Sequence, residues 1–155
     1  MSTNPGIEIQ CAISADGLPS AAKLHQWLQF ALQERADESE LTLRIVDEAE
    51  ITALNHRYRG KDGATNVLSF PYQPLPGVES GLLGDIVICA PVVAQEAIAQ
   101  SKTLEAHWAH ITIHGVLHLL GHDHQEVQDA GQMEQLETQL LGKLGFADPY
   151  RPPAD

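Results

Sequence analysis

The sequence has few of the features that would set it apart from an ordinary globular domain. Its two cysteines, Cys11 and Cys89, lie far apart in apolar stretches, without the C-x-x-C spacing of a redox or zinc site. We therefore expect two buried free thiols rather than a disulfide or a cysteine-bound metal. No apolar run approaches the ~18 residues of a membrane span, and the N-terminus lacks the pattern of a secretory signal. These absences predict a cytoplasmic protein without a membrane partner.

Basic residues are also scarce. Nine Lys and Arg residues stand against 21 Asp and Glu residues, and the formal net charge is -12. Non-specific adhesion to nucleic acid depends mostly on contacts between basic side chains and phosphates, so this balance opposes it. An anionic substrate would need a local attraction, and three basic residues lie close together at Arg57, Arg59 and Lys61.

The chain shows no internal repeat, low-complexity tract or linker. Its 43% hydrophobic and 19% charged residues are typical of a globular domain. A chain of this length buries roughly two-thirds of the surface that it exposes when unfolded, so it can fold without disulfides. We expect one domain over residues 1–155, with a loose C-terminal tail from about 148 to 155.

Hydrophobic periodicity divides the chain into strands and helices. Strands are predicted over residues 7–12, 40–47, 66–72 and 82–90, and helices over residues 18–32, 47–58, 91–100, 103–120 and 127–144. Asp47 with Glu50 is typical of a helix N-cap and its acidic third residue, and Gly121 is typical of the residue after a helix end. The order β-α-β-α-β-β-α-α-α predicts an α+β fold with one small mixed four-stranded sheet and about five helices.

Histidine is concentrated in one short segment. Six of the eight histidines lie between residues 107 and 124, and four follow one helical stripe: His107, His110, His114 and His118. Side chains at i and i+4 stand ~5–6 Å apart on a helix, so two imidazoles can reach one ion at Zn–N distances of about 2.0–2.1 Å. A turn at Gly121 can then bring His124 back towards the same ion.

Three histidine ligands with an open fourth position are typical of a catalytic zinc site. We predict His114, His118 and His124 as the ligands of one Zn²⁺ ion per chain, with His110 and His114 as the competing pair. His107 and His110 are otherwise expected beneath or beside the site. Three imidazoles also accept Ni, Co, Cu or Fe, so the sequence leaves the identity of the metal open.

Two carboxylates near these elements have roles that the sequence leaves open. Asp123 precedes the third predicted ligand, where it could orient an imidazole, act on water or simply stabilise a turn. Asp85 lies within an otherwise apolar strand, so we expect it to have a partner, either a histidine or the end of a neighbouring helix.

The segment HGVLHLLGHDH (114–124) resembles the H-G-x-L-H-L-x-G-[YH]-D-H signature of the YbeY family of bacterial rRNA-maturation endoribonucleases. The segment NHRYRGKDGATNVLSFP (55–71) resembles the second block of that family. LLGDIVIC and EAHWAHITIHG are also similar to family members, so the likeness extends along most of the chain. Many relatives carry Asp in place of Asn66, which is not a ligand position.

The resemblance implies a zincin-like α+β fold, one zinc ion held by His114, His118 and His124, and metal-dependent cleavage of single-stranded RNA. It also implies a role in 3′-end maturation of 16S rRNA, in late ribosome assembly and in 70S ribosome quality control. The expected partners are rRNA, the ribosomal small subunit and ribosome-associated proteins. The family's conserved arginine corresponds to Arg59.

Gly115 distinguishes this motif from the H-E-x-x-H helix of zinc proteases, which carries a catalytic glutamate at that position. A peptidase needs that carboxylate as a base, whereas a metal-bound water can attack a phosphodiester directly. We expect a glutamate here to repel an incoming phosphate, and glycine to allow close approach of helix or substrate. Arg59 is the candidate for stabilising the phosphate, because guanidinium donates two hydrogen bonds to phosphate oxygens.

Two alternatives remain open at this point. A metal-dependent hydrolase of another class, such as a peptidase or amidase, is disfavoured by the missing glutamate. A non-catalytic assembly factor would use the metal to stabilise its C-terminal helices and would act by docking on the ribosome. These alternatives differ from the nuclease in whether the metal takes part in RNA cleavage.

Overall fold

A computed structural model of the chain describes residues 6–14, 17–33, 39–72, 82–121 and 127–150. Its elements follow the predicted order. The strands are β1 (Ile7–Cys11), β2 (Glu40–Val46), β3 (Val67–Pro71) and β4 (Leu82–Cys89), and the helices are α1 (Ala21–Leu32), α2 (Glu48–Arg59), α3 (Ala90–Ala99), α4 (Leu104–Leu119) and α5 (Val127–Lys143). The predicted α+β class, with a small mixed four-stranded sheet and five helices, is confirmed.

The strands form one sheet in the order β1-β2-β4-β3. β1, β2 and β4 run parallel, and β3 pairs antiparallel with β4 at one edge. The central pair of strands places apolar residues side by side, with Leu43 opposite Ile86 and Ile45 opposite Ile88. All four of these side chains are buried, as expected where a sheet is covered by helices.

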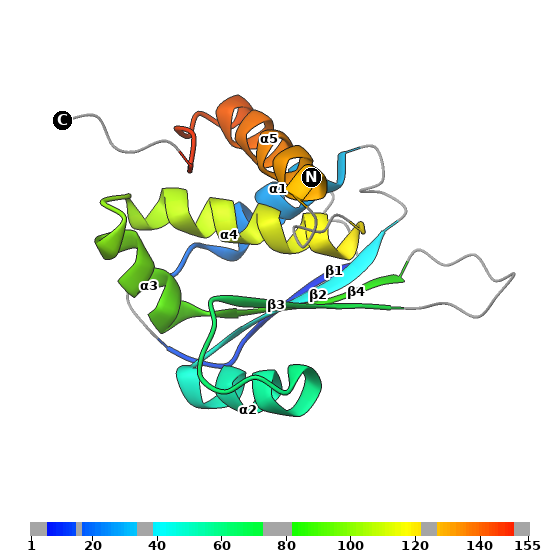
Figure 1. The fold of residues 1–155 in the computed structure, drawn as a ribbon, viewed down its shortest axis with the longest axis vertical. Helices are drawn as coiled ribbons and strands as arrows, with labels where there is room; N and C mark the ends of the chain where they lie inside the picture. The colour runs from blue at the N-terminus through cyan, green and yellow to red at the C-terminus, as the bar shows by residue number, and fades with distance from the viewer. Residues whose placement is uncertain (1–5, 15–16, 34–38, 73–81, 122–126, 151–155) are drawn as a thin grey trace, which may run out of the picture.

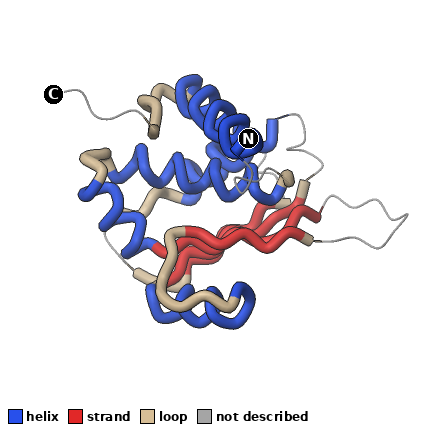
Figure 2. Tube along the Cα trace, viewed as in Figure 1, coloured by secondary structure: helices blue, strands red, loops and turns tan. Residues whose placement is uncertain are grey.

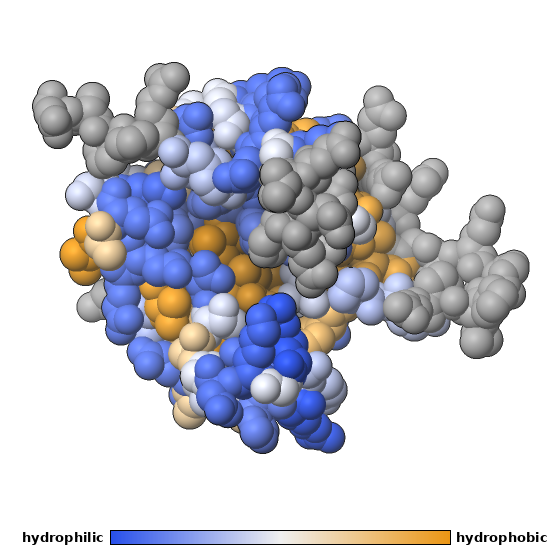
Figure 3. Space-filling model, in the orientation of Figure 1, coloured by the Kyte–Doolittle hydropathy of each residue, from blue (hydrophilic) through white to orange (hydrophobic). Residues whose placement is uncertain are grey.

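The helices cover the two faces of the sheet unequally. α2 lies on one face, while α1, α3, α4 and α5 lie on the other (Figures 1 and 2). Because successive strand residues point to opposite faces, each face has its own hydrophobic cluster. Leu43 and Ile86 belong to the larger cluster with α1 and α4, and Val46 and Val87 belong to the smaller one with α2. Figure 3 shows a hydrophilic surface over α2 and apolar atoms between the α2 and α4 layers.

α4 is the central helix of the larger layer. It begins after Thr103, whose hydroxyl accepts a hydrogen bond from the backbone N–H of Ala106 at 3.1 Å. It ends before Gly121, whose φ of 99° is the left-handed conformation that glycine adopts easily. Contacts with α1, α3, α5, β3 and β4 surround this helix. It is therefore a rigid support for the histidines that it carries.

One expectation from the sequence needs correction. Cys89 is buried, but Cys11 is exposed at the end of β1, which is an edge strand. At the start of the expected tail, the Asp148 carboxylate accepts hydrogen bonds from the Thr138 hydroxyl at 3.3 Å and the Tyr150 backbone N–H at 2.8 Å. Residues 151–155 lie outside the described part. Among the described residues, no helix is long and apolar enough to cross a membrane.

Candidate metal centre

The stripe of four histidines lies along α4 as predicted. His107 and His110 are buried, while His114 and His118, nearer the C-terminal end of the helix, are partly exposed. Neighbouring rings along the stripe lie at centroid distances of 5.9, 6.2 and 4.6 Å, and the shortest separates His114 from His118. The last two histidines are therefore the closest pair and the most accessible one.

His114 and His118 point their Nε2 atoms at each other, at a distance of 3.1 Å. Two nitrogens bound to one tetrahedral zinc ion, at Zn–N distances of about 2.0–2.1 Å, would lie about 3.3–3.4 Å apart. The pair therefore needs to separate by only a few tenths of an ångström to hold a common ion. The residues fit the metal that the sequence predicts.

The Nδ1 atom of His114 faces the carboxylate of Glu137, a fully buried residue of α5. Burial opposes ionisation of Glu137, but hydrogen bonds from His110 and His114 outweigh it and lower the pKa of this carboxyl to about 2. An ionised carboxylate can only accept hydrogen bonds, so His114 Nδ1 is the donor. In a neutral ring, Nε2 is then the acceptor that faces His118.

A second arrangement of the same residues also resembles a metal site. One ligand atom each from His110, His114 and Glu137 lie within 4.8 Å of one another. However, Nδ1 of His114 and one oxygen of Glu137 are already paired by a hydrogen bond, so an ion held by these two atoms would have to replace that bond. The Nε2 pair of His114 and His118 is therefore the better candidate for the ion.

The third predicted ligand, His124, and its neighbour Asp123 lie outside the described residues. The left-handed turn at Gly121, on which the return of the chain depends, is present as expected. The assignment of His114, His118 and His124 as a complete set therefore stays a prediction.

His107 takes part in a separate polar network at the start of α4. Its Nε2 atom contacts Glu96 of α3 at 2.9 Å, and the same carboxylate accepts hydrogen bonds from the Asn66 amide at 3.0 and 3.3 Å. Burial lowers the pKa of His107 more than the hydrogen bond with Glu96 raises it. The Asn66 amide thus donates hydrogen bonds to Glu96, which an ionised Asp at this position could not do.

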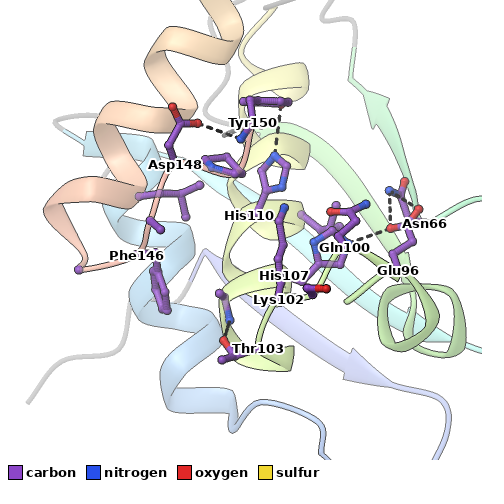
Figure 4. A pocket seen from close by; sticks show the side chains of 17 residues that line it. Asn66, Glu96, Gln100, Lys102, Thr103, His107, His110, Phe146, Asp148 and Tyr150 are labelled. Carbon is purple, nitrogen blue, oxygen red and sulfur yellow. Dashed lines mark hydrogen bonds and ion pairs between the residues drawn. The ribbon is translucent and has the colours of Figure 1, made fainter. Parts of the chain in front are cut away.

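A cavity of about 810 Å³ lies beside this network. Figure 4 shows His110 between Tyr150 and the side chain of Lys102, with Glu96 at one side. Tyr150 lies in the segment after α5, and its hydroxyl donates a hydrogen bond to Glu137. His107 and His110 therefore belong both to the histidine stripe and to the lining of the cavity.

Gly115 faces the sheet rather than the exposed side of α4. A Cβ atom at this position would lie 2.9 Å from a methyl group of Ile86 and 3.4 Å from one of Val67. The predicted close approach of the helix is confirmed. The idea that a glutamate here would repel the substrate is wrong, because its side chain would point into the core.

Arg59 is the last residue of α2, on the opposite face of the sheet from α4, and is exposed. Within the described part of the chain its guanidinium makes no hydrogen bond or ion pair. Figure 1 shows the C-terminal ends of α2 and α4 on the same side of the molecule, on either side of the edge strand β3. A substrate lying along this edge could contact both ends.

Among the described residues, Asp85 has no hydrogen-bond or ion-pair partner of the kind expected from the sequence. Its side chain is exposed on β4, opposite Phe70 of β3. Solvent therefore satisfies the carboxylate, and neither a histidine nor a helix end is needed.

Sequence reasoning missed Glu137 and Tyr150. Glu137 shares a helix face with Met133 and Leu140, both of which are buried. The sequence did contain a signal for Glu137, because it is an acidic residue among apolar residues at helical spacing. Such a position predicts a buried carboxylate, and a buried carboxylate requires hydrogen-bond partners. Tyr150 gave no comparable signal, since it follows the last helix.

Two comparisons with known proteins bear on the family and the fold of this chain. The family model described as endoribonuclease YbeY matches residues 10–145. The solution structure of TM1509 from Thermotoga maritima has a TM-score of 0.57 and 24% sequence identity, covering 94% of this chain and 99% of that chain. At this identity the structural likeness concerns the fold alone, and it agrees with the predicted α+β class with a small mixed four-stranded sheet. Because the family match spans most of the sequence, the chain belongs to the YbeY family of rRNA-processing endoribonucleases.

Proposed function

We propose that this chain is a zinc-dependent endoribonuclease specific for single-stranded RNA. Its place is the cytoplasm, in 3′-end maturation of 16S rRNA, late ribosome assembly and 70S ribosome quality control. Its partners are the ribosomal small subunit and ribosome-associated proteins. The observation that carries the proposal is the 3.1 Å approach of the Nε2 atoms of His114 and His118, in a chain that matches the endoribonuclease family over residues 10–145.

The proposed mechanism assigns a role to each polar group near the site. His114, His118 and His124 would hold the ion, which when bound supplies a Lewis acid and lowers the pKa of water. Arg59 neutralises the negative charge that gathers on the phosphate in the transition state. Asp123 is the candidate for moving the proton.

The position of Gly115 is compatible with a nuclease that lacks the protease glutamate. A Cβ atom at Gly115 would lie 2.9 Å from a methyl group of Ile86, so a longer side chain at the second position of the motif would point towards the sheet and displace core residues. A glutamate here could therefore not serve as the protease base without repacking, which disfavours a peptidase or amidase of the H-E-x-x-H type.

The decisive experiment is metal analysis of protein purified without chelator or added metal, followed by RNA cleavage with the same sample. The wild type should carry about one ion per chain and cut single-stranded RNA. His114→Ala and His118→Ala should lose both properties, while His56→Ala, which changes an exposed histidine of α2, should retain them.

Three outcomes would contradict the proposal. Unchanged metal content in His118→Ala would refute the ligand assignment. A folded, metal-free His114→Ala protein that still supports ribosome maturation would show that the chain acts as a non-catalytic assembly factor. Cleavage of casein but not of RNA by the wild type would instead indicate a peptidase.

A further inference from the structure

The side of His114 that faces away from His118 is enclosed by protein. Nδ1 of His114 donates to Glu137, and the other oxygen of that carboxylate accepts from the Tyr150 hydroxyl and contacts His110 Nε2 at 3.4 Å. Both oxygens of Glu137 are therefore occupied, and its side chain has no exposure to solvent.

We propose that Glu137 is the positioning residue of the metal centre, and that Tyr150 holds it in place from the C-terminal segment. This inference rests on the proposed function, because it concerns the ion bound by His114 and His118. A carboxylate that accepts from Nδ1 keeps the proton on that nitrogen and directs Nε2 towards the ion.

The role of Tyr150 follows from the alternatives open to the Glu137 carboxylate. Without the Tyr150 hydroxyl, His110 would be the remaining partner of that oxygen, and the carboxylate could turn further towards His110, whose ring lies 6.2 Å from that of His114. The Tyr150 hydroxyl binds the same oxygen that faces His110. It therefore leaves the other oxygen for His114. The segment after α5 thus takes part in orienting a metal ligand that lies on α4.

The test measures zinc affinity by chelator competition on folded protein, without RNA. Glu137→Gln removes the charge but retains the size of the side chain, and we expect it to weaken zinc binding by roughly 10–100-fold, as for other partners of metal-bound histidines. Tyr150→Phe should also weaken zinc binding, but less than Glu137→Gln does, because the Glu137 carboxylate remains.

Two matched controls separate positioning from general effects of substitution. Glu134→Gln changes an exposed acid one turn earlier on the same helix. Tyr72→Phe changes a tyrosine that is 45% exposed, as Tyr150 is. Both should bind zinc with wild-type affinity. Wild-type affinity in both Glu137→Gln and Tyr150→Phe would overturn the proposal.

A tautomer measurement keeps the proposal testable even if Glu137→Gln does not fold. Long-range ¹H–¹⁵N correlation spectra of the metal-free protein should show His114 protonated at Nδ1 in the wild type. In Tyr150→Phe the population protonated at Nε2 should increase. A role of Tyr150 in stability alone would leave this ratio unchanged, and that result would contradict the proposal.

A different pattern would show that Glu137 is itself a ligand, together with His110 and His114. In that case His110→Ala and Glu137→Gln would lose zinc entirely, while His118→Ala would retain it. That pattern would overturn the positioning role. Failure of the proposed function would look different. If the variants showed the expected zinc affinities but the zinc-loaded wild type did not cleave RNA, the nuclease would be refuted and the role of Glu137 would remain.

Discussion

A single glycine determines how closely the histidine helix approaches the sheet. Gly115→Ala would place a Cβ atom 2.9 Å from a methyl group of Ile86, so the Ile86 side chain, α4 or β4 must shift. Overpacking of this kind costs roughly 1–3 kcal/mol, and we expect a loss of that size in the free energy of unfolding, measured with denaturant. Gly131→Ala is the control, since a Cβ atom there meets nothing within 4 Å; it should stabilise the protein by about 0.4–1 kcal/mol.

Arg59 offers a test of phosphate recognition that leaves the metal centre intact. Arg59→Glu should retain fold and zinc content, because the residue is exposed and outside the histidine network. Cleavage of single-stranded RNA should fall by roughly 10²–10³, by analogy with the loss of a donor to a developing oxyanion. Arg57→Glu, which changes an arginine placed over the Tyr58 ring, should have a smaller effect. Equal cleavage rates for wild type and Arg59→Glu would remove Arg59 from the mechanism.

At the residue scale, the sequence predicts those parts of the site that are local. His114 and His118 are one helical turn apart, so their proximity follows from helix geometry. Glu137 lies on another helix and Tyr150 follows that helix, and their contacts with α4 arise from packing between α4 and α5. No pattern in the sequence specifies which side of α5 meets which histidine.

The capping of α4 provides a prediction at the scale of an element. Thr103→Ala removes the side-chain acceptor for the Ala106 N–H, and the free energy of unfolding should fall by about 1 kcal/mol. Thr103→Ser retains the hydroxyl and should be close to the wild type. Since the cap is at the opposite end of α4 from His118, zinc affinity of the folded variant should not change. A loss of affinity in Thr103→Ala would show that the helix moves as a whole.

The elements themselves were predictable because their signals are local. Strand alternation, the Asp47 cap and the turn at Gly121 each involve residues close in sequence, and each is present. The strand order β1-β2-β4-β3 was not predicted. It depends on which strands pair across long separations, and periodicity carries no information about that choice.

At the scale of the whole molecule, metal binding and folding should be linked. The ion would be held by residues of one helix and the following turn, an arrangement that the unfolded chain does not preserve. Zinc at 100 times its dissociation constant should therefore raise the free energy of unfolding by about 2.7 kcal/mol. His118→Ala should show no such increase, and an equal increase in that variant would place the ion elsewhere.

The stability of the molecule should also depend on pH through His107, which joins α4 to α3. Burial lowers the pKa of this imidazole below its ordinary value of 6.5; Glu96 opposes the shift, while Lys102 and His110 reinforce it. Below pH 6.5 the unfolded chain therefore binds a proton more readily than the folded one, so the stability contributed by neutral His107 is lost as pH falls from 6.5 towards the lowered pKa.

The measurement is denaturant unfolding of wild type and His107→Gln on both sides of pH 6.5. A glutamine side chain can still donate a hydrogen bond to Glu96 but does not titrate. The free energy of unfolding of His107→Gln should therefore fall less than that of the wild type as the solution is acidified. The free-energy difference between the two proteins should therefore shift in favour of the variant at low pH. A difference that is constant with pH would mean that the pKa of His107 is the same in the folded and unfolded chains, and that burial beside α3 does not destabilise its charged form.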